Sequence, residues 1–162
     1  MFLRSLSLAV LLLTAVACGE EIGDECTISS DCSPQGDRIC DVNSPGGYCT
    51  ILGCDVGTCP DEAVCVRFFP VQDTNRLCDP NTDDGGASSC SADEVCTFAG
   101  TCAPRNAEVR FCMKTCSDNG DCRDDYECRD ADLMREHGGE PVPESGEPTG
   151  SKLTNFCAAE PQ

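Results

Sequence analysis

Apolar side chains occur along most of this chain in short runs broken by Gly, Asp and Pro. Four runs combine β-branched or aromatic residues with adjacent turn residues, and each predicts a short strand: Gly46–Ile51, Ala63–Phe69, Glu94–Phe98 and Val109–Lys114. Asp130–His137 predicts two helical turns that end at Gly138. The pattern therefore indicates small hairpins with little helix.

Two polar segments separate or follow these runs. Asp79–Ser89 is expected to be a linker. Gly138–Ser151 is rich in Gly, Pro, Glu and Ser, a composition typical of disordered loops, and Cys157 is expected to close it.

The N-terminal apolar run differs from the others in length. Arg4 precedes an almost unbroken apolar stretch, Leu6–Ala17, that ends in small residues. A stable membrane-spanning helix needs about 20 such residues, so this run is too short to span. Its order of charge, apolar core and small residues is that of a secretory signal peptide, predicted here as residues 1–17.

Cysteine dominates the composition, with 17 residues in 162. In an exported chain this density indicates a disulfide scaffold. There is no Cys-x-x-Cys pair and His137 is the only histidine, so the sequence predicts neither a metal site nor a cofactor. The predicted fold class is small and disulfide-rich, with short β-hairpins, little helix and long loops.

The order of the cysteines suggests an internal duplication. We expect disulfides among sixteen cysteines in two sets of eight: Cys26, Cys32, Cys40, Cys49, Cys54, Cys59, Cys65 and Cys78, followed by Cys90, Cys96, Cys102, Cys112, Cys116, Cys122, Cys128 and Cys157. The first seven of each set are offset by 62 to 64 residues, and Tyr48 and Phe111 each directly precede a cysteine. "CPDEAVC" also aligns with "CRDDYEC". The predicted domains are module 1 (26–78), a linker (79–89) and module 2 (90–157, with a disordered loop at 138–151). The connectivity stays open, because eight cysteines allow many pairings.

Cys18 is the odd cysteine, and it directly follows the apolar run. Ala15-Val16-Ala17-Cys18 resembles the lipobox of bacterial lipoproteins, although that family prefers Leu, Val or Ile where Ala15 stands. The resemblance implies cleavage before Cys18, lipid attachment to its sulfur and a tether over residues 18–25. Gly19 resembles the outer-membrane pattern of such proteins. Ordinary signal peptidase would cut the same bond and leave a secreted protein with a free thiol.

The modules show a second resemblance. "CTISSDCSPQGDRICDVNSPGGYC" and "CSADEVCTFAGTC" have cysteine spacings similar to those of EGF-like domains, Dickkopf N-terminal domains and multi-cysteine bacterial lipoproteins. This resemblance implies an extracellular cysteine-rich repeat and assigns no activity to any residue.

Charge narrows the range of partners. All 29 acidic residues follow Cys18, and Arg4 alone of the 11 basic residues precedes it. Removing the leader therefore changes the net charge from −18 to −19. That charge disfavours contact with nucleic acid or anionic membrane surfaces. The carboxylates of Ser117–Asp125 and Asp79–Gly86 could serve as ligands of a calcium ion, which is an alternative partner. The preference of Asp and Asn for turns also explains these residues.

The candidate partner contacts are Arg67, Phe68, Phe69 and Val71, in the stretch Val66–Leu77. The alternative is that Phe68, Phe69 and Val71 form the core of module 1. Acidic turns at Asp61, Glu62, Asp124 and Asp125 are a second candidate surface. Since His137 has no evident catalytic partner, we predict no enzyme. The expected function is a non-enzymatic binding or structural lipoprotein of the envelope, whose partners are the membrane, through its lipid, and an envelope or extracellular protein. The alternatives are a secreted protease inhibitor using Arg67 or Arg76, or a calcium-binding module.

Overall fold

The computed structural model describes residues 20–70, 76–82, 87–147, 150 and 153–161. Its elements, in chain order, are α1 (Ser29–Cys32), β1 (Ile39–Cys40), β2 (Cys49–Thr50), β3 (Ala63–Phe68), η1 (Ala87–Ser89), β4 (Glu94–Cys96), β5 (Cys102–Pro104), η2 (Arg105–Ala107), β6 (Val109–Lys114), η3 (Asn119–Asp121), β7 (Tyr126–Arg129), α2 (Ala131–His137), β8 (Glu140–Pro141) and β9 (Phe156–Ala159). The small disulfide-rich fold with little helix is confirmed. Each of the four predicted strand segments contains a strand, and the predicted helix is α2. In the described part of the chain no helix is long and apolar enough to cross a bilayer.

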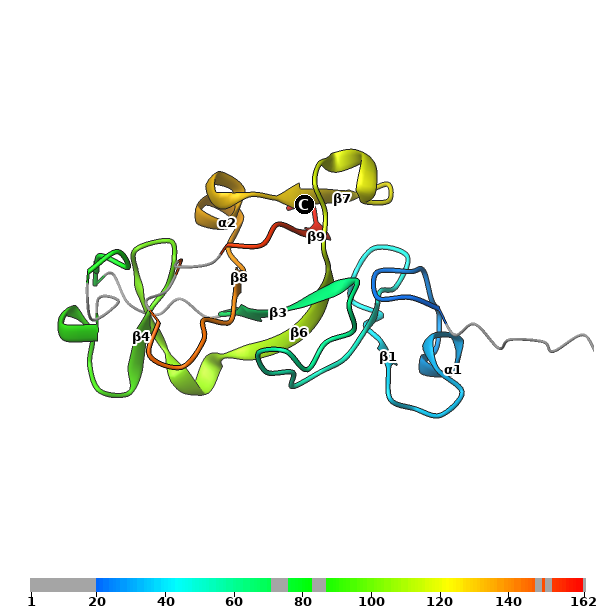
Figure 1. The fold of residues 1–162 in the computed structure, drawn as a ribbon, viewed down its shortest axis with the longest axis horizontal. Coiled ribbons are helices and arrows are strands. Elements are labelled where there is room, and N and C mark those ends of the chain that lie inside the picture. The colour runs from blue at the N-terminus through cyan, green and yellow to red at the C-terminus, as the bar shows by residue number, and fades with distance from the viewer. Residues whose placement is uncertain (1–19, 71–75, 83–86, 148–149, 151–152, 162) are drawn as a thin grey trace, which may run out of the picture.

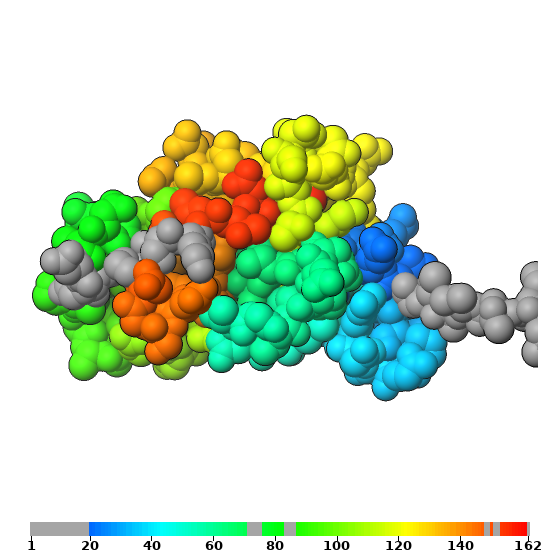
Figure 2. Space-filling view, viewed as in Figure 1, coloured from blue at the N-terminus to red at the C-terminus, as the bar shows by residue number. Residues whose placement is uncertain are grey.

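A three-stranded sheet in the order β6-β3-β8 forms the centre of the molecule. β3 and β6 pair antiparallel over their full length, from Ala63 opposite Lys114 to Phe68 opposite Val109. The remaining strands form three two-stranded sheets, β1-β2, β4-β5 and β7-β9. β1 and β4 lie at opposite ends of an elongated molecule, and β7, β9 and α2 lie along one side of the central sheet (Figure 1). The space-filling view shows the same order, with the C-terminal segments between the two ends (Figure 2).

Eight disulfides cross-link this arrangement, and they follow one rule. We divide the cysteines into four units of four: unit 1 (Cys26, Cys32, Cys40, Cys49), unit 2 (Cys54, Cys59, Cys65, Cys112), unit 3 (Cys78, Cys90, Cys96, Cys102) and unit 4 (Cys116, Cys122, Cys128, Cys157). In every unit the first cysteine bonds to the third and the second to the fourth.

The units also share their backbone geometry. In each, the third and fourth cysteines lie directly opposite one another on paired antiparallel strands: Cys40 and Cys49, Cys65 and Cys112, Cys96 and Cys102, Cys128 and Cys157. The first two cysteines therefore attach the preceding loop to the two strands of the hairpin. Such a unit needs few apolar residues, because its bridges restrict the unfolded chain.

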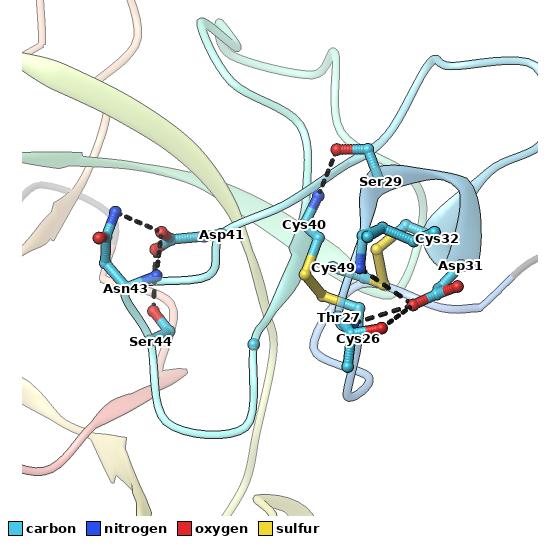
Figure 3. Close-up of a disulfide and its surroundings, with 12 residues drawn as sticks. Cys26, Thr27, Ser29, Asp31, Cys32, Cys40, Asp41, Asn43, Ser44 and Cys49 are labelled. Carbon is cyan, nitrogen blue, oxygen red and sulfur yellow. Dashed lines mark hydrogen bonds between the residues drawn. A yellow bond between two sulfur atoms is a disulfide. The ribbon is translucent and has the colours of Figure 1, made fainter.

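Unit 1 shows how the sequence sets up this loop (Figure 3). The carboxylate of Asp31 accepts hydrogen bonds from the backbone N–H of Thr27 and Ile28 and from the Thr27 hydroxyl, at 2.9, 3.1 and 2.9 Å. These bonds hold the pKa of the Asp31 carboxyl below its ordinary value. Ser29 Oγ accepts from the backbone N–H of Cys40 at 3.2 Å. The loop is thereby fixed to the strand that carries the third cysteine.

Unit 4 repeats the device. Asp121 accepts from the N–H of Ser117 at 2.7 Å, and Asn119 Oδ1 accepts from the N–H of Cys128 at 2.8 Å. "CTISSDC" and "CSDNGDC" are therefore equivalent loops. In unit 2, Thr58 Oγ1 replaces the carboxylate and accepts from the N–H of Asp55 at 2.8 Å.

The disulfides correct the expected division into two separately cross-linked modules. Cys59–Cys112 and Cys78–Cys96 join the first set of eight cysteines to the second. All of unit 3 is inserted between the third and fourth cysteines of unit 2. Residues 79–89 are consequently no linker between modules, because their part of the chain lies inside unit 3. The repeating element is the unit of four cysteines.

The disulfides confirm the alignment of the two sets of eight cysteines over part of its length. Cys54, Cys59 and Cys65 have the same roles in unit 2 as Cys116, Cys122 and Cys128 have in unit 4. Cys26, the first cysteine of unit 1, was instead matched with Cys90, the second of unit 3. Similar spacings recur in every unit, so an alignment that is out of phase also finds matches.

The main core lies between the central sheet and β9, and its fully buried side chains include Ile22, Val66, Met134 and Phe156. Ile22 comes from the expected tether at 18–25. The next residues also belong to the folded body, since Gly23 N–H donates to Cys49 O and Cys49 N–H donates to Asp24 O. Residues 22–24 of the expected tether therefore belong to the folded body.

The segment expected to be disordered, 138–151, contains β8. Val66 and Arg67 of β3 lie opposite Pro141 and Glu140. The Glu140 side chain is only 5% exposed, and Arg67 neutralises its charge inside the protein. Composition suggested disorder, but this long-range ion pair orders the start of the segment.

Candidate binding groove

The structure describes three of the four predicted contact residues, and it places them in two different environments. Arg67 is buried, and its Nε and Nη2 lie 2.8 and 2.6 Å from Glu140 Oε1. Its prediction as a partner contact, and as an inhibitor's basic side chain, is therefore wrong. Phe68 and Phe69 are half-buried. Val71 lies outside the described residues.

Phe68 and Phe69 contact different parts of the protein. The Arg67 guanidinium lies 5.5 Å from the centre of the Phe69 ring, so Phe69 helps to cover that ion pair. Phe68 makes edge-to-face contacts with Phe111 and Phe156, each at 6.2 Å between ring centroids. Its ring is part of the core and also lines two cavities.

The larger cavity, which we call the groove, has a volume of about 340 Å³. Its apolar lining includes Phe68 from β3 and Phe111 and Met113 from β6. Unit 1 contributes a loop to its lining, with Asp41, Ser44 and Tyr48. Thr50 of β2 also lines it, and Arg129, His137 and Ala159 complete the lining from β7, α2 and β9. The groove thus forms where unit 1, the central sheet and unit 4 meet.

Tyr48 holds these parts together. Its hydroxyl donates to Cys157 O at 3.3 Å and accepts from the N–H of Lys114 at 3.0 Å. Burial raises its pKa above the ordinary value for tyrosine. The Tyr48 hydroxyl therefore stays protonated at neutral pH and uses its hydrogen bonds to join unit 1 to β6 and β9.

Arg129 also directs its hydrogen bonds to other groups of the protein. Its Nε donates to Glu127 Oε1 at 2.8 Å, and its Nη1 donates to the carbonyls of His137 and Gly138 at 3.1 and 2.8 Å. Nη2 donates to Ala159 O at 2.8 Å. This buried guanidinium positions the end of α2 beside the groove.

His137 has a partner that the sequence did not reveal. Its Nδ1 lies 2.7 Å from Glu127 Oε1, the oxygen that also accepts from Arg129. Its Nε2 lies 3.8 Å from the exposed carboxylate of Glu136. The expectation that His137 stands alone is therefore corrected. No signal in the sequence pointed to this pair, because β7 and α2 must pack before the two side chains meet.

Asp41 is the acidic side chain of the groove. Oδ1 accepts from the N–H of Asn43 at 3.1 Å, and Oδ2 accepts from Ser44 Oγ at 2.8 Å. In the part of the chain that the structure describes, Asp41 forms no ion pair. The Ser44 hydroxyl donates its hydrogen bond to Asp41. His137 therefore does not activate Ser44 as a nucleophile in this arrangement.

The smaller cavity, of about 230 Å³, shares Phe68 and His137 with the groove. Gly139 lies in its wall at a φ of 76°, and a Cβ there would come within 2.6 Å of the Phe68 ring. Met134 lines this cavity, whereas Met113 lines the groove. Each cavity therefore has its own methionine.

Of the acidic residues in Ser117–Asp125, Asp118 and Asp121 cap the backbone, whereas the candidate contacts Asp61, Glu62, Asp124 and Asp125 show no such bonds among the described residues. Asp118 Oδ1 accepts from the N–H of Gly120 at 2.7 Å, and Asp121 accepts from that of Ser117. Asp61, Asp124 and Asp125 are exposed, and Glu62 lies 3.8 Å from Arg38. Among the described residues, the groups of three or more His, Cys, Asp or Glu side chains that lie close enough to share a metal ion consist of cysteines. All of these cysteines are in disulfides.

Comparison of the chain with protein-family models, with curated proteins and with solved structures found no match to any of them.

Proposed function

We propose that this protein is a non-enzymatic binding protein of the cell envelope, anchored by a lipid on Cys18. The number of disulfides is the observation that supports lipid attachment at Cys18. Eight disulfides pair all sixteen cysteines of the described residues with one another, and Cys18 is the one cysteine outside them. An apolar leader and lipobox-like residues directly precede it.

The position of the folded body agrees with an anchor. Ile22 is already fully buried, four residues after Cys18. A lipid on Cys18 would hold unit 1 close to the membrane, and unit 3 would lie at the far end of the elongated body (Figure 1). Attachment by several acyl chains is stable where a single chain is only marginal.

Binding, rather than catalysis, is supported by the chemistry of the groove. Tyr48, Arg129 and Ser44 direct their hydrogen bonds to other groups of the protein. A surface held by eight disulfides loses little conformational entropy on association, which favours binding. Glu127 and His137 position one another but have no activated nucleophile among the groove residues described above.

The anchor is tested by replacing Cys18 with Ser in the full-length chain. We expect the variant to leave the membrane fraction and to lose labelling by a fatty-acid probe. Glu20→Gln is the matched control, because it changes a neighbouring residue and keeps Cys18. Mass spectrometry of the wild-type protein should show the lipid, and thiol titration under denaturing, non-reducing conditions should find no free thiol. A wild-type chain with one free thiol and no lipid would contradict the anchor and favour a secreted protein.

A further inference from the structure

We infer that the groove binds a lysine or arginine side chain of a cationic protein partner, with the methylene stem on its apolar lining and the charged head at Asp41. The inference rests on the proposed binding function and names the partner's chemistry. It follows from three properties of the groove, which are its apolar lining, its acidic group and the field around it.

The apolar lining suits a flexible hydrocarbon stem. Phe68, Phe111 and Met113 present two aromatic rings and a thioether to the cavity. Long basic side chains bury their methylene groups along such surfaces while keeping the charged end in a polar environment. Aromatic faces also attract cations directly.

The acidic group of the groove is a half-buried carboxylate that forms no ion pair with the described residues. The more deeply buried carboxylates in or beside the core are paired with arginine: Glu140 with Arg67, Glu94 with Arg76 and Glu127 with Arg129. Asp41 is half-buried, and its described contacts are donors without charge. An ionised carboxylate has about four lone-pair positions, so Asp41 can still accept a hydrogen bond from a cation.

The charges beside the groove have both signs. Arg123 lies 5.8 Å from the centre of the Tyr48 ring and directs its Nη2 to the carbonyls of Pro45 and Gly47. Arg129 is neutralised by Glu127, and Glu136 lies beside His137 with 74% of its side chain exposed. The chain without its leader has a net charge of −19, which attracts cationic partners over a distance and increases the rate of encounter. The same net charge repels an anionic partner over a distance.

Two methionines allow a direct test. The chain has three, of which Met1 lies in the leader, Met113 lines the groove and Met134 lines the smaller cavity. We would label the methionine methyl groups of the soluble Cys18→Ser protein with ¹³C and titrate it with a short lysine homopeptide. The Met113 signal should shift in a saturable manner, and the Met134 signal should shift little.

Variants then separate a specific site from general attraction to an acidic protein. Asp41→Asn should weaken binding of the lysine peptide by about tenfold, a typical effect of removing one partner of a partly desolvated charge pair. Asp61→Asn is the matched control, because it removes the same charge at an exposed turn and should change binding less than about twofold. A homopeptide of ornithine, which keeps the charge at neutral pH on a shorter methylene stem, should bind more weakly than the lysine peptide.

Three outcomes would overturn the inference. These are equal losses for Asp41→Asn and Asp61→Asn, equal binding of the two homopeptides, or a shift confined to Met134. None of them bears on the lipid at Cys18, which is measured separately. Conversely, a protein that proves to be secreted without lipid could still show the Met113 response, so the two proposals fail independently.

Discussion

The rings of Tyr48 and Tyr126 stack with their centroids 5.4 Å apart and their planes 24° from parallel. Tyr48 belongs to the hairpin of unit 1 and Tyr126 to β7 of unit 4. Arg123 reinforces the contact, because its guanidinium lies 4.3 Å from the Tyr126 ring centre and its Nη2 donates to Pro45 O at 2.7 Å. This stack joins two distant parts of the chain beside the groove.

The first prediction uses both tyrosines as titration probes. Burial raises both of their pKa values, whereas tyrosines of the unfolded chain ionise near pH 10. Their contribution to the free energy of unfolding is therefore complete below about pH 10 and is lost as the pH rises towards the folded pKa values. The protein has two tyrosines and no tryptophan, so phenolate absorbance reports on these two rings alone.

We expect phenolate absorbance to appear well above pH 10 and to rise together with the loss of near-ultraviolet circular dichroism. In Tyr48→Phe the total absorbance change should fall by half. Ionisation of both tyrosines near pH 10 in a protein that keeps its fold would contradict the burial of these hydroxyl groups.

The second prediction concerns the turn that places Tyr48. Gly47 has a φ of 71°, and a Cβ there would lie 1.9 Å from the carbonyl oxygen of Cys26. Gly47→Ala should therefore greatly reduce the yield of correctly oxidised protein. Gly53→Ala is the control, since Gly53 has a φ of 77° but nothing within 4 Å of the added Cβ. It should cost only about 1–2 kcal/mol of backbone strain. Similar denaturation midpoints for the two variants would show that the Gly47 turn relaxes.

The third prediction concerns the ion pair between Arg67 and Glu140. Removing one partner leaves the other buried without its counter-charge, so Arg67→Met should lower the free energy of unfolding by about 3–5 kcal/mol. Arg110→Met breaks a more exposed pair with Glu108 and Asp55 and should cost about 1 kcal/mol or less. Urea denaturation measures both effects. Equal losses would mean that the burial of Arg67 has little energetic consequence.

The fourth prediction concerns disulfides between the two halves of the chain. Peptide mapping of the oxidised protein should recover Cys59 linked to Cys112 and Cys78 linked to Cys96. A fragment covering residues 20–79 should then keep two thiols, at Cys59 and Cys78, because their partners are missing. A fragment with no free thiol would indicate a different pairing and would restore the two separate modules.

The amino-acid sequence by itself determined the class of fold and several of its elements. Local signals sufficed where neighbouring residues carry the information, as in the β-branched and aromatic residues of β3 and β6 and in α2. Asp130 caps α2 by accepting from the N–H of Asp132 and Leu133, and Gly138 ends it at a φ of 77°. The density and number of cysteines also predicted the eight disulfides and the odd Cys18.

Only the tertiary structure decided which cysteines pair and where the groove lies. Spacing limits the length of a loop, but a disulfide also requires that two strands lie opposite one another, and β6 reaches β3 after all of unit 3 has intervened. The sequence favoured a surface position for Arg67, but Arg67 is buried because it forms an ion pair with Glu140, which lies in a segment rich in Gly and Pro. Glu127 and His137 likewise meet only when α2 packs beside β7. Such contacts depend on the packing of separate elements against one another, and no local pattern in the sequence predicts them.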